Sequence, residues 1–535
     1  MATKDRDTAF FGHPVGLRTL FFTEMWERFS YYGMRAFLML YMIGSIAVGG
    51  RGMTVTSAGL VMALFLSSVY LLSLPGGWIA DRFVGQRAAV MIGGVGIAGG
   101  NALLALPADA LFYPGLTLIA LGTGLLKPNV STIVGQLYDA KDIRRDSGYT
   151  IYYMGINVGA MIAPIVCGYF AQGESFQGFL SSHGIDPRWC WHFGFAASAV
   201  GMVAGLIQYG LSQRSLDEAG KHPHIPSDPA RASRDRKVLT GIIGALGVVV
   251  VAFVLASLSD SVTVSATTIT DIFGVGLAIG SIVLFYGLLS SARDASERRR
   301  VIAMIPLFVG SIAFFGIFEQ ASTTLSVFAE KLTDRQLLGV NIPASYYQSV
   351  NSIFIIALAP VFAWMWLRLA RANKEPSSVM KFSIGMALVA LSFVVMLPTL
   401  PSVMHGGTTS GGYLILLYFL YTCAELCISP VGLSSMSKLA PARLAGMVMG
   451  TWFLGAANGN YLAGRAAGFS EQRGFAFLFY FLIISALVVS AALFFVAPRI
   501  RRMMESEAAS SEPDKPEKSE PEPLAKARVV KSGDA

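Results

Sequence analysis

Charged residues interrupt a long apolar segment near the start of the chain. Residues 20–46 are long and apolar enough to cross a bilayer, which takes roughly 20 residues of helix, yet they contain Glu24, Glu27, Arg28 and Arg35. At about 100° per residue, a helix places all four on one stripe, together with Tyr31 and with Tyr32 at its margin. A charge at the centre of a bilayer costs at least about 2.5–3.5 kcal/mol. The stripe must therefore face polar partners or a wet cavity.

The stripe could handle protons. Glu24 and Glu27 lie one helical turn apart and can hinder each other's ionisation, so that one of them binds a proton near neutral pH. The alternative is a buried ion pair that only locks one helix to another. For an isolated Glu–Arg pair, the functional and the purely structural interpretation would be equally good. The number of charges and tyrosines on this stripe favours the functional interpretation.

The composition is that of a polytopic membrane protein. Of the 535 residues, 54% are hydrophobic and 14% are charged, whereas soluble domains are about 25% charged. The net charge of +8 could suggest nucleic-acid binding. The basic residues, however, lie in short loops between apolar segments, where they set topology. We therefore expect the bilayer, and not nucleic acid, as a partner.

The apolar segments predict an all-α membrane protein with about 14 spans. Twelve of them form two groups of six, separated by an inserted pair at 238–258 and 270–291 that reads as peripheral scaffold. The predicted parts are a six-helix bundle at 1–211, a linker with two extra helices at 212–299, a second bundle at 300–502 and a disordered tail at 503–535. Two six-helix halves around a midplane site are typical of secondary transporters.

The positively charged loops predict the orientation. Lys and Arg cluster in alternate loops, for example at 82–87, 141–145, 231–237, 293–300, 368–374, 438–443 and 499–502, whereas the loops 257–270 and 401–411 contain none. The positive-inside rule then places both termini in the cytoplasm.

The turn after the second span reads GGWIADRFVGQR, from Gly76 to Arg87. It resembles the cytoplasmic loop motif of the major facilitator superfamily, and we expect Asp81 and Arg82 to pair or to cap a helix across it. An ordinary charged turn is the alternative. The chain has no phosphate-binding Gly-Lys-Thr/Ser loop, so ATP is not the expected driving force.

Two further motifs resemble those of the proton-dependent oligopeptide transporter family. Residues 24–33, EMWERFSYYG, match its E-x-x-E-R-F-x-Y-Y-G signature. Residues 152–160, YYMGINVGA, match its F-Y-x-x-I-N-x-G-S signature with Tyr for Phe and Ala for Ser. The resemblance covers all the spans, implies the major facilitator fold, and is more specific for the family than for the substrate.

Two buried charge pairs are expected to act as gates. Lys127 lies before Pro128 inside the fourth span, where a lysine needs a partner or loses its proton. Glu425 in the tenth span is the natural candidate, and the resemblance implies that the two pair near the cytoplasmic gate. It likewise implies that Glu319 pairs with Arg35 toward the outer gate. Purely structural bridges remain the alternative.

The resemblance also implies a peptide site with two poles, since a peptide has an amine at one end and a carboxylate at the other. Arg28, Tyr32 and Lys127, with Arg35 nearby, are assigned to the carboxylate pole. The amine pole is assigned to Asn157, Asn351 and Glu425, and the walls to Tyr31, Tyr70, Trp452 and Phe453. For any single aromatic residue, core packing is the simpler interpretation.

The expected function is proton-coupled import of di- and tripeptides by alternating access in a bacterial inner membrane, with the protein acting as a monomer. Protons are the coupling ion, carried by Glu24, Glu27 and Glu319 beside Arg28, and no other cofactor or metal is expected. Animal members use a His in the second span, which residues 56–80 lack. The alternatives are a carrier of nitrate, a drug-like compound or a sugar, and a peptide-binding membrane sensor. An enzyme is not expected, since no nucleophile–His–acid set lies within the spans.

Overall fold

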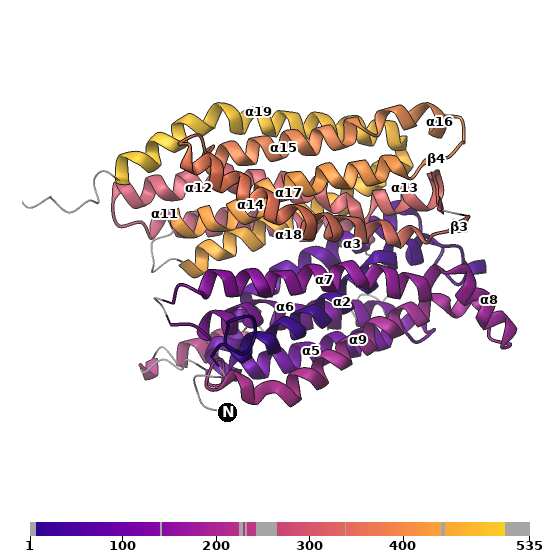
Figure 1. The fold of residues 1–535 in the computed structure, drawn as a ribbon, viewed down its shortest axis with the longest axis horizontal. Coiled ribbons are helices and arrows are strands. Elements are labelled where there is room, and N and C mark those ends of the chain that lie inside the picture. Colours follow the sequence, from indigo (N-terminus) through magenta and orange to yellow (C-terminus); the bar gives the residue numbers. More distant parts are fainter. Residues whose placement is uncertain are drawn as a thin grey trace, which may run out of the picture.

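The computed structural model describes residues 7–139, 142–223, 228–230, 233–241, 265–337, 339–439 and 445–508. Its long helices run roughly parallel in two bundles that lie side by side (Figure 1). The helices of the first half, indigo to magenta, form the lower bundle in this view, and those of the second half form the upper one. This arrangement confirms an all-α membrane protein of the major facilitator type.

The first bundle contains six long helices and two short ones. They are α2 (Val15–Ile43), α3 (Val55–Leu71), α4 (Ser73–Ile79), α5 (Gln86–Leu104), α6 (Asp109–Gln136), α7 (Arg145–Gln172), α8 (Glu174–Ser182) and α9 (Cys190–Ser212). The predicted boundary at residue 211 thus falls at the end of α9.

The second part begins with the inserted helix α11 (Ala266–Ser290), which packs on α18 (Ala445–Gln472) through the Asn458–Ser281 hydrogen bond of 3.1 Å. The second bundle consists of α12 (Ala295–Phe318), α13 (Thr324–Leu332), α14 (Tyr347–Arg371), α15 (Ser378–Val394), α16 (Leu400–Met404), α17 (Gly412–Leu439), α18 (Ala445–Gln472) and α19 (Gly474–Ala508). Because α12 begins at Ala295 and α19 continues to Ala508, helix extends beyond both predicted limits of this bundle, 300 and 502.

Among the described residues, 11 helical stretches are long and apolar enough to span a membrane. Helices α2 and α18 are also long enough but fall outside this set; α2 does so because of its charged stripe. The predicted span 238–258 lies largely outside the described residues, as does most of the tail, so the count of about 14 spans is not confirmed.

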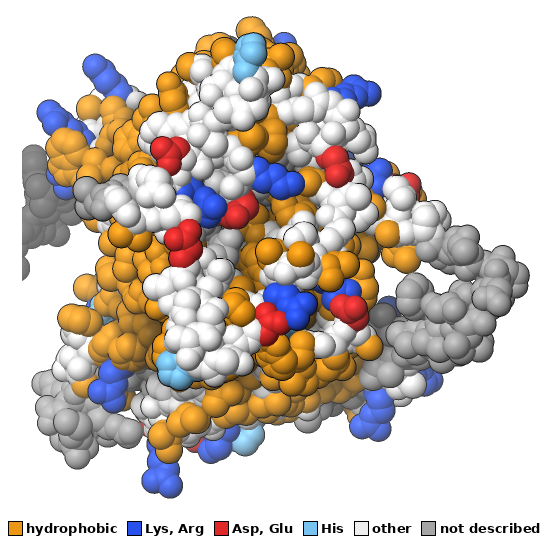
Figure 2. Space-filling model, turned by 90° about the vertical axis from the view of Figure 1, so that its right-hand side faces the viewer, with side chains coloured by type: hydrophobic (Ala, Val, Ile, Leu, Met, Phe, Trp, Pro, Cys, Tyr) orange, Lys and Arg blue, Asp and Glu red, His pale blue; other side chains and the backbone are white. Residues whose placement is uncertain are grey.

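The two ends of the bundle differ. One end, here called the terminal end, holds the first described residues and the last turns of α19, at the left of Figure 1. The opposite end carries β1 (Thr333–Asp334), which pairs in parallel with β4 (Thr409–Ser410), and β2 (Gln336–Leu337), which pairs antiparallel with β3 (Val340–Asn341). Figure 2 looks onto this opposite end, where acidic and basic side chains alternate among hydrophobic ones.

Helix interruptions place the chemistry-bearing residues. Pro128 follows Lys127 inside α6. Helix α12 stops at Phe318, a 3-10 turn covers Glu319–Ser322, and α13 restarts after Thr323, whose backbone is non-helical at φ −116° and ψ −92°. Glu319 therefore sits at a break between two helices, where backbone groups and hydroxyls can surround its carboxylate.

The motif at Gly76–Arg87 folds differently from the prediction. Arg82 pairs with Asp235 of the linker at 3.7 Å, and Asp81 accepts a hydrogen bond from Gln86 at 2.8 Å. The expected Asp81–Arg82 pair is thus wrong, because neighbouring side chains on a helical turn point in different directions. Gly85 has φ +80°, a left-handed conformation that favours glycine.

Candidate functional site

The stripe on α2 is buried, and three of its four charges are paired with one another. Arg28 Nε lies 3.1 Å from Glu24 Oε1 and also contacts Glu27. The Tyr152 hydroxyl of α7 donates a 2.6 Å hydrogen bond to the other oxygen of Glu24. Glu24, Glu27 and Arg28 are 1%, 0% and 3% exposed, so the cluster is shielded from bulk water.

Not every polar atom of this cluster is satisfied. Among the described residues, Arg28 Nη2, Glu27 Oε1 and the Tyr31 hydroxyl are buried without a hydrogen-bond partner. A buried donor without a partner costs about 1–3 kcal/mol. Native proteins keep few such groups, so each one calls for an explanation, and a functional role is one of them. The unsatisfied guanidinium nitrogen is a place where an anionic ligand group could bind.

Two tyrosines connect the two arginines of α2. The Tyr31 ring lies 5.3 Å from Arg28 Cζ and 5.9 Å from Arg35 Cζ, and the Tyr32 ring lies 5.9 and 5.6 Å from the same atoms. Cation–π contact at such distances is favourable. The stripe is therefore one continuous arrangement of charge and aromatic face along the helix, as its spacing predicted.

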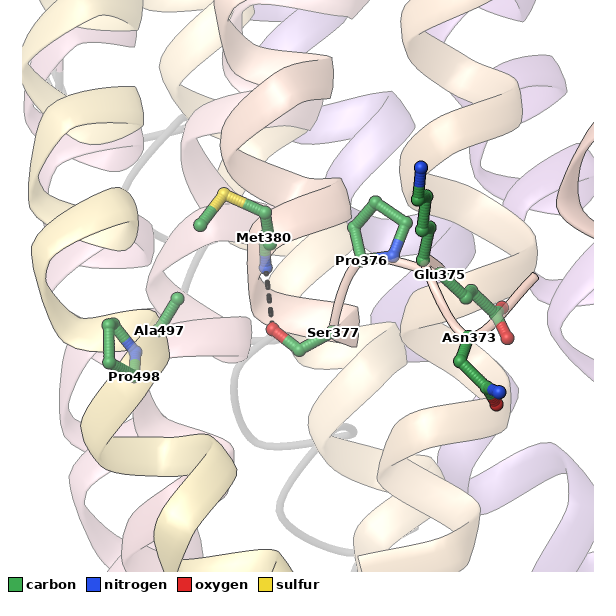
Figure 3. Close-up of a pocket in the computed structure, with 8 residues that line it drawn as sticks. Asn373, Glu375, Pro376, Ser377, Met380, Ala497 and Pro498 are labelled. Carbon is green, nitrogen blue, oxygen red and sulfur yellow. Dashed lines mark hydrogen bonds between the residues drawn. The ribbon is translucent and has the colours of Figure 1, made fainter. Parts of the chain in front are cut away.

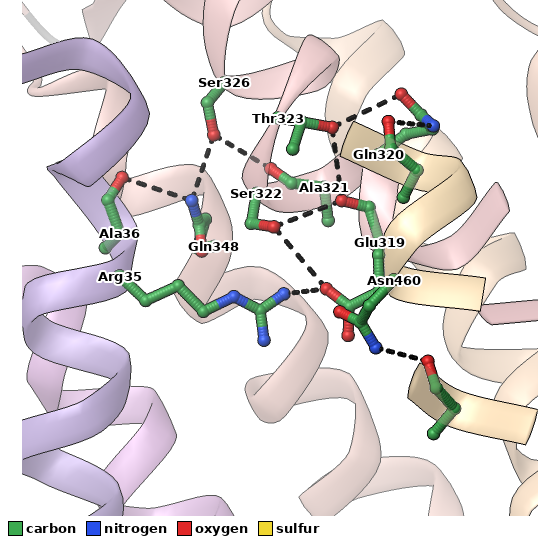
Figure 4. A network of polar contacts seen from close by, with 12 residues as sticks. Arg35, Ala36, Glu319, Gln320, Ala321, Ser322, Thr323, Ser326, Gln348 and Asn460 are labelled. Atoms are coloured by element: carbon green, nitrogen blue, oxygen red, sulfur yellow. Dashed lines mark hydrogen bonds and ion pairs between the residues drawn. The ribbon is translucent and has the colours of Figure 1, made fainter. Parts of the chain in front are cut away.

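Arg35 pairs with Glu319 across the two bundles, and both side chains are buried. Ser322 donates to the Glu319 carbonyl at 3.1 Å, and its hydroxyl also lies 3.5 Å from the carboxylate (Figure 4). Next to this pair, Gln348 Nε2 donates to the Ala36 carbonyl of α2 at 3.1 Å and to the Ser326 hydroxyl at 3.0 Å. The structure thus forms the ion pair expected from the sequence and adds Gln348 as a second link.

Lys127 and Glu425, in contrast, do not pair in this structure. The Lys127 ammonium lies 4.1 Å from the centre of the Tyr70 ring, and Glu425 accepts a 3.1 Å hydrogen bond from Asn351. The expected contact is absent here: Lys127 on α6 lies against an aromatic ring of its own bundle, and Glu425 on α17 is bound by an amide of its own bundle, the second one. The distance between them depends on how the bundles are tilted against each other.

The residues assigned to the amine pole are partly together. Asn351 Nδ2 donates both to Glu425 and, at 3.0 Å, to the Thr422 hydroxyl one turn earlier on α17. Asn157 lies on α7 in the other bundle and donates to the Tyr153 carbonyl at 3.1 Å. Thr422 was missed by the sequence reasoning, although its position three residues before Glu425 places it on the same helix face.

The four aromatic residues assigned to the walls have different surroundings. Tyr70 lies 6.4 Å from Phe315, which in turn lies 5.7 Å from Trp452, measured between ring centres, so this row crosses from one bundle to the other. Trp452 is 8% exposed and belongs to the hydrophobic core. Phe453 is half-buried and makes no aromatic pair in the described part of the chain.

A separate pocket lies at the terminal end, away from these residues. It is formed by the connection from α14 to α15, including Glu375 and Ser377, and by Ala497 and Pro498 of α19 (Figure 3). The Ser377 hydroxyl accepts from the Met380 amide at 3.3 Å and so caps α15. None of the predicted site residues lines this pocket. The described residues also contain no group of His, Cys, Asp and Glu that could hold a metal ion.

Comparison with known proteins places these features in a family. The model of the POT family matches residues 83–478. The chain is 39% identical over 500 residues to the uncharacterized transporter YclF of Bacillus subtilis. This alignment covers 92% of this chain and 96% of that protein. It is 36% identical over 458 residues to a di-/tripeptide transporter of Lactococcus lactis subsp. cremoris, covering 84% and 88%.

A solved structure agrees with the fold. The crystal structure of a peptide transporter POT in complex with sulfate superposes with a TM-score of 0.82 at 40% sequence identity, covering 94% of this chain and 99% of that chain. The family model covers most of the chain, and the sequence and structural relatives span nearly its whole length. The chain is a member of the POT family of membrane transporters.

Proposed function

We propose that this protein imports di- and tripeptides together with protons by alternating access across a bacterial inner membrane. The relatives named as peptide transporters support the substrate class, and the family supports proton coupling. The positive-inside pattern supports the terminal end as cytoplasmic and the opposite end as external.

One observation supports the proposal more than any other. The buried Arg28 keeps a nitrogen without a partner among the described residues, while Glu425 with Asn351 presents acceptors from the other bundle. A peptide carboxylate matches the first group, and a peptide amine matches the second. A ligand that touches both poles bridges the bundles and so senses their relative position.

The state of the two gate pairs supports an inward-facing conformation. The Arg35–Glu319 pair is formed, and Gln348 reinforces it from the same side. The Lys127–Glu425 contact is not formed. In an alternating-access cycle the external pair would open as the cytoplasmic pair closes, so that the site is exposed to one side at a time.

Proton coupling follows from competition for the arginine. While Glu24 and Glu27 are ionised, they hold Arg28. When one of them takes a proton from the external side, its negative charge is lost and its attraction for Arg28 weakens. The released guanidinium then binds the incoming peptide carboxylate. After the bundles tilt, loss of the proton to the cytoplasm restores the ion pair and displaces the peptide.

Counterflow in proteoliposomes tests the proposal. Vesicles that contain the protein and unlabelled dialanine should accumulate labelled dialanine, and an imposed inward proton gradient should drive net uptake. N-acetylated dialanine should compete poorly, because Glu425 and Asn351 lose a charged donor. Protein-free vesicles are the control. Accumulation of labelled nitrate but not of dialanine would favour another carrier, and binding without counterflow would favour a sensor.

A further inference from the structure

At the opposite end, the carboxylate of one bundle caps a helix of the other. Helix α3 begins at Val55 with its first amide groups free of intrahelical partners. Glu471, at the end of α18, accepts hydrogen bonds from the Thr56 amide at 2.8 Å and from the Thr56 hydroxyl at 2.6 Å. Its second oxygen accepts from the Val55 amide at 3.3 Å. An exposed surface carboxylate thus has both of its oxygens engaged across the interface.

The helix seam below this cap is tightly packed. A Cβ on Gly464 of α18 would lie 2.4 Å from the Gly59 carbonyl of α3, and further along, Ser67 donates to the Ala457 carbonyl at 2.8 Å. The two helices are therefore in backbone contact, and the cap lies at the external end of that contact. Opening the external side by tilting the bundles must break the cap.

We propose that Glu471 is a second latch of the external gate, which acts on the α3–α18 seam while Arg35 and Glu319 act at the centre. This inference rests on the proposed direction of transport and deepens it. The cap satisfies amide groups at the positive end of a helix dipole, so it stabilises the closed external side. Glu471 is a positioning residue, since it does not contact the candidate peptide site.

The latch is charged at every physiological pH. Partial burial alone would raise the pKa of Glu471, but the hydrogen bonds from Thr56 and Val55 outweigh it and hold the pKa below its ordinary value. A carboxylate with a lowered pKa keeps its charge above the ordinary value and loses it only as the pH falls through the lowered one. Besides these donors, Lys331 is the charged group that acts on it. Glu471 therefore sets the gate equilibrium and does not carry the coupled proton.

The experiment compares Glu471→Gln and Glu471→Ala with Asp109→Asn in cells that take up labelled dialanine. Asp109 is a matched control, because its 2.8 Å ion pair with Arg51 lies on the same face but within one bundle. Loss of the latch should raise the outward-open population up to about tenfold. The apparent affinity for external dialanine scales with the fraction of the protein in the outward-open state. The KM for external dialanine should therefore fall. The pH profile of uptake should keep its shape.

Hydrogen exchange at the first turn of α3 gives a readout that does not need transport. The amides of Val55 and Thr56 should exchange severalfold faster in the Glu471 variants and should be unchanged in Asp109→Asn. Thr56→Val, which removes one of the bonds, should shift both readouts less. Unchanged exchange and KM in Glu471→Ala, or a raised KM, would overturn the latch. If the wild type fails to transport dialanine, the proposed function fails, while exchange still decides the latch.

Discussion

At the scale of single residues, Arg28 shows why a guanidinium is required. One nitrogen, Nε, contacts both Glu24 and Glu27, while Nη2 is buried without a partner among the described residues. A lysine ammonium has its three donors on one rotating nitrogen, so it does not hold a donor in a fixed direction away from the two carboxylates as a planar guanidinium does. In the proposed cycle, Arg28 would therefore serve both coupling and binding with one side chain.

We predict that Arg28→Lys lowers gradient-driven dipeptide uptake at least about tenfold, since the loss of one charged hydrogen bond is worth roughly 1.5–3 kcal/mol. Uptake in proteoliposomes under an imposed proton gradient measures this. Arg18→Lys on the same helix is the control, because Arg18 is exposed near the start of α2. Wild-type uptake in Arg28→Lys would show that only the charge matters.

Tyr152 carries a related prediction. Its hydroxyl is a buried donor to Glu24 at 2.6 Å, so Tyr152→Phe leaves that oxygen without this hydrogen bond. We expect gradient-driven uptake to fall severalfold, with counterflow affected less, because coupling depends on Glu24 more than the tilt of the bundles does. Tyr149→Phe on the same helix, which loses only a 3.2 Å bond to the Ser131 carbonyl, should retain its uptake. Equal losses in both variants would contradict this role.

Sequence reasoning reached the stripe but not all its partners. The helical period places Glu24, Glu27, Arg28 and Arg35 on one face, which the structure reproduces. Tyr152 belongs to the second family motif, yet its contact with Glu24 depends on α7 packing beside α2. Periodicity within one helix does not contain that information. Likewise, no local pattern says which of two gate pairs is formed in a given conformation.

At the scale of elements, the long helices could be predicted and their interruptions could not. Hydropathy gives no sign of the helix break at Glu319, and it places 401–411 in a loop, where the structure has the short α16 at Leu400–Met404. Such breaks depend on tertiary hydrogen bonds that replace the helical ones. The break at Glu319 places its buried carboxylate in contact with Arg35 and Ser322.

The segment before α2 is held to the α6–α7 connection by His13. Its Nδ1 lies 2.9 Å from the Tyr138 hydroxyl, and its Nε2 lies 3.3 Å from the Ser147 hydroxyl. Burial lowers the pKa of His13 from its ordinary value of 6.5, and Arg144 lowers it further, against an opposing effect of Asp142. The neutral ring is thus the form that fits.

We predict that stability falls as the pH drops below about 6.5, where the unfolded chain binds a proton that the folded His13 site disfavours. The melting temperature of the detergent-solubilised protein measures this between about pH 7.5 and 5.5. His13→Gln should flatten this slope, and His405→Gln, at an exposed position, should leave it unchanged. An identical slope in wild type and His13→Gln would remove His13 as its cause.

The α3–α18 seam gives a steric prediction. A methyl group on Gly464 would meet the Gly59 carbonyl at 2.4 Å and the Ala63 amide at 2.5 Å, both backbone atoms that cannot rotate away. Gly464→Ala should therefore force the helices apart at a cost of about 1–3 kcal/mol and lower the melting temperature. Gly450→Ala on the same helix meets only the flexible Leu74 side chain at 3.3 Å and should be tolerated. Thermal unfolding of both variants compares them, and equal melting temperatures would contradict close packing as the constraint.

At the scale of the whole molecule, several polar links join the two bundles from the centre to the opposite end. Besides Arg35–Glu319 and Glu471, the Gln172 amide donates to Glu330 at 3.2 Å, and Asn341 donates to Glu174 at 2.8 Å. Each link joins the first bundle to the second. When the bundles tilt, weak contacts of this kind can be replaced by similar contacts at the terminal end with little net change in free energy. This suits a carrier that must populate both an inward-facing and an outward-facing state.

Coupling is a property of this whole arrangement, and it yields the last prediction. Glu24→Gln and Glu27→Gln each place an uncharged group of similar shape beside Arg28, as permanent protonation would. Either variant should lose concentrative uptake under a proton gradient, because no proton is bound and released in the cycle. Counterflow without a gradient should survive, since the loaded carrier still tilts between its two states. Both measurements are made on the same proteoliposomes, with Asp109→Asn as a carboxylate control outside the stripe, because Asp109 pairs with Arg51 within one bundle. If both variants accumulate dialanine as the wild type does, the coupled proton binds elsewhere, with Glu319 the next candidate, and the α2 stripe holds the helices together without driving transport.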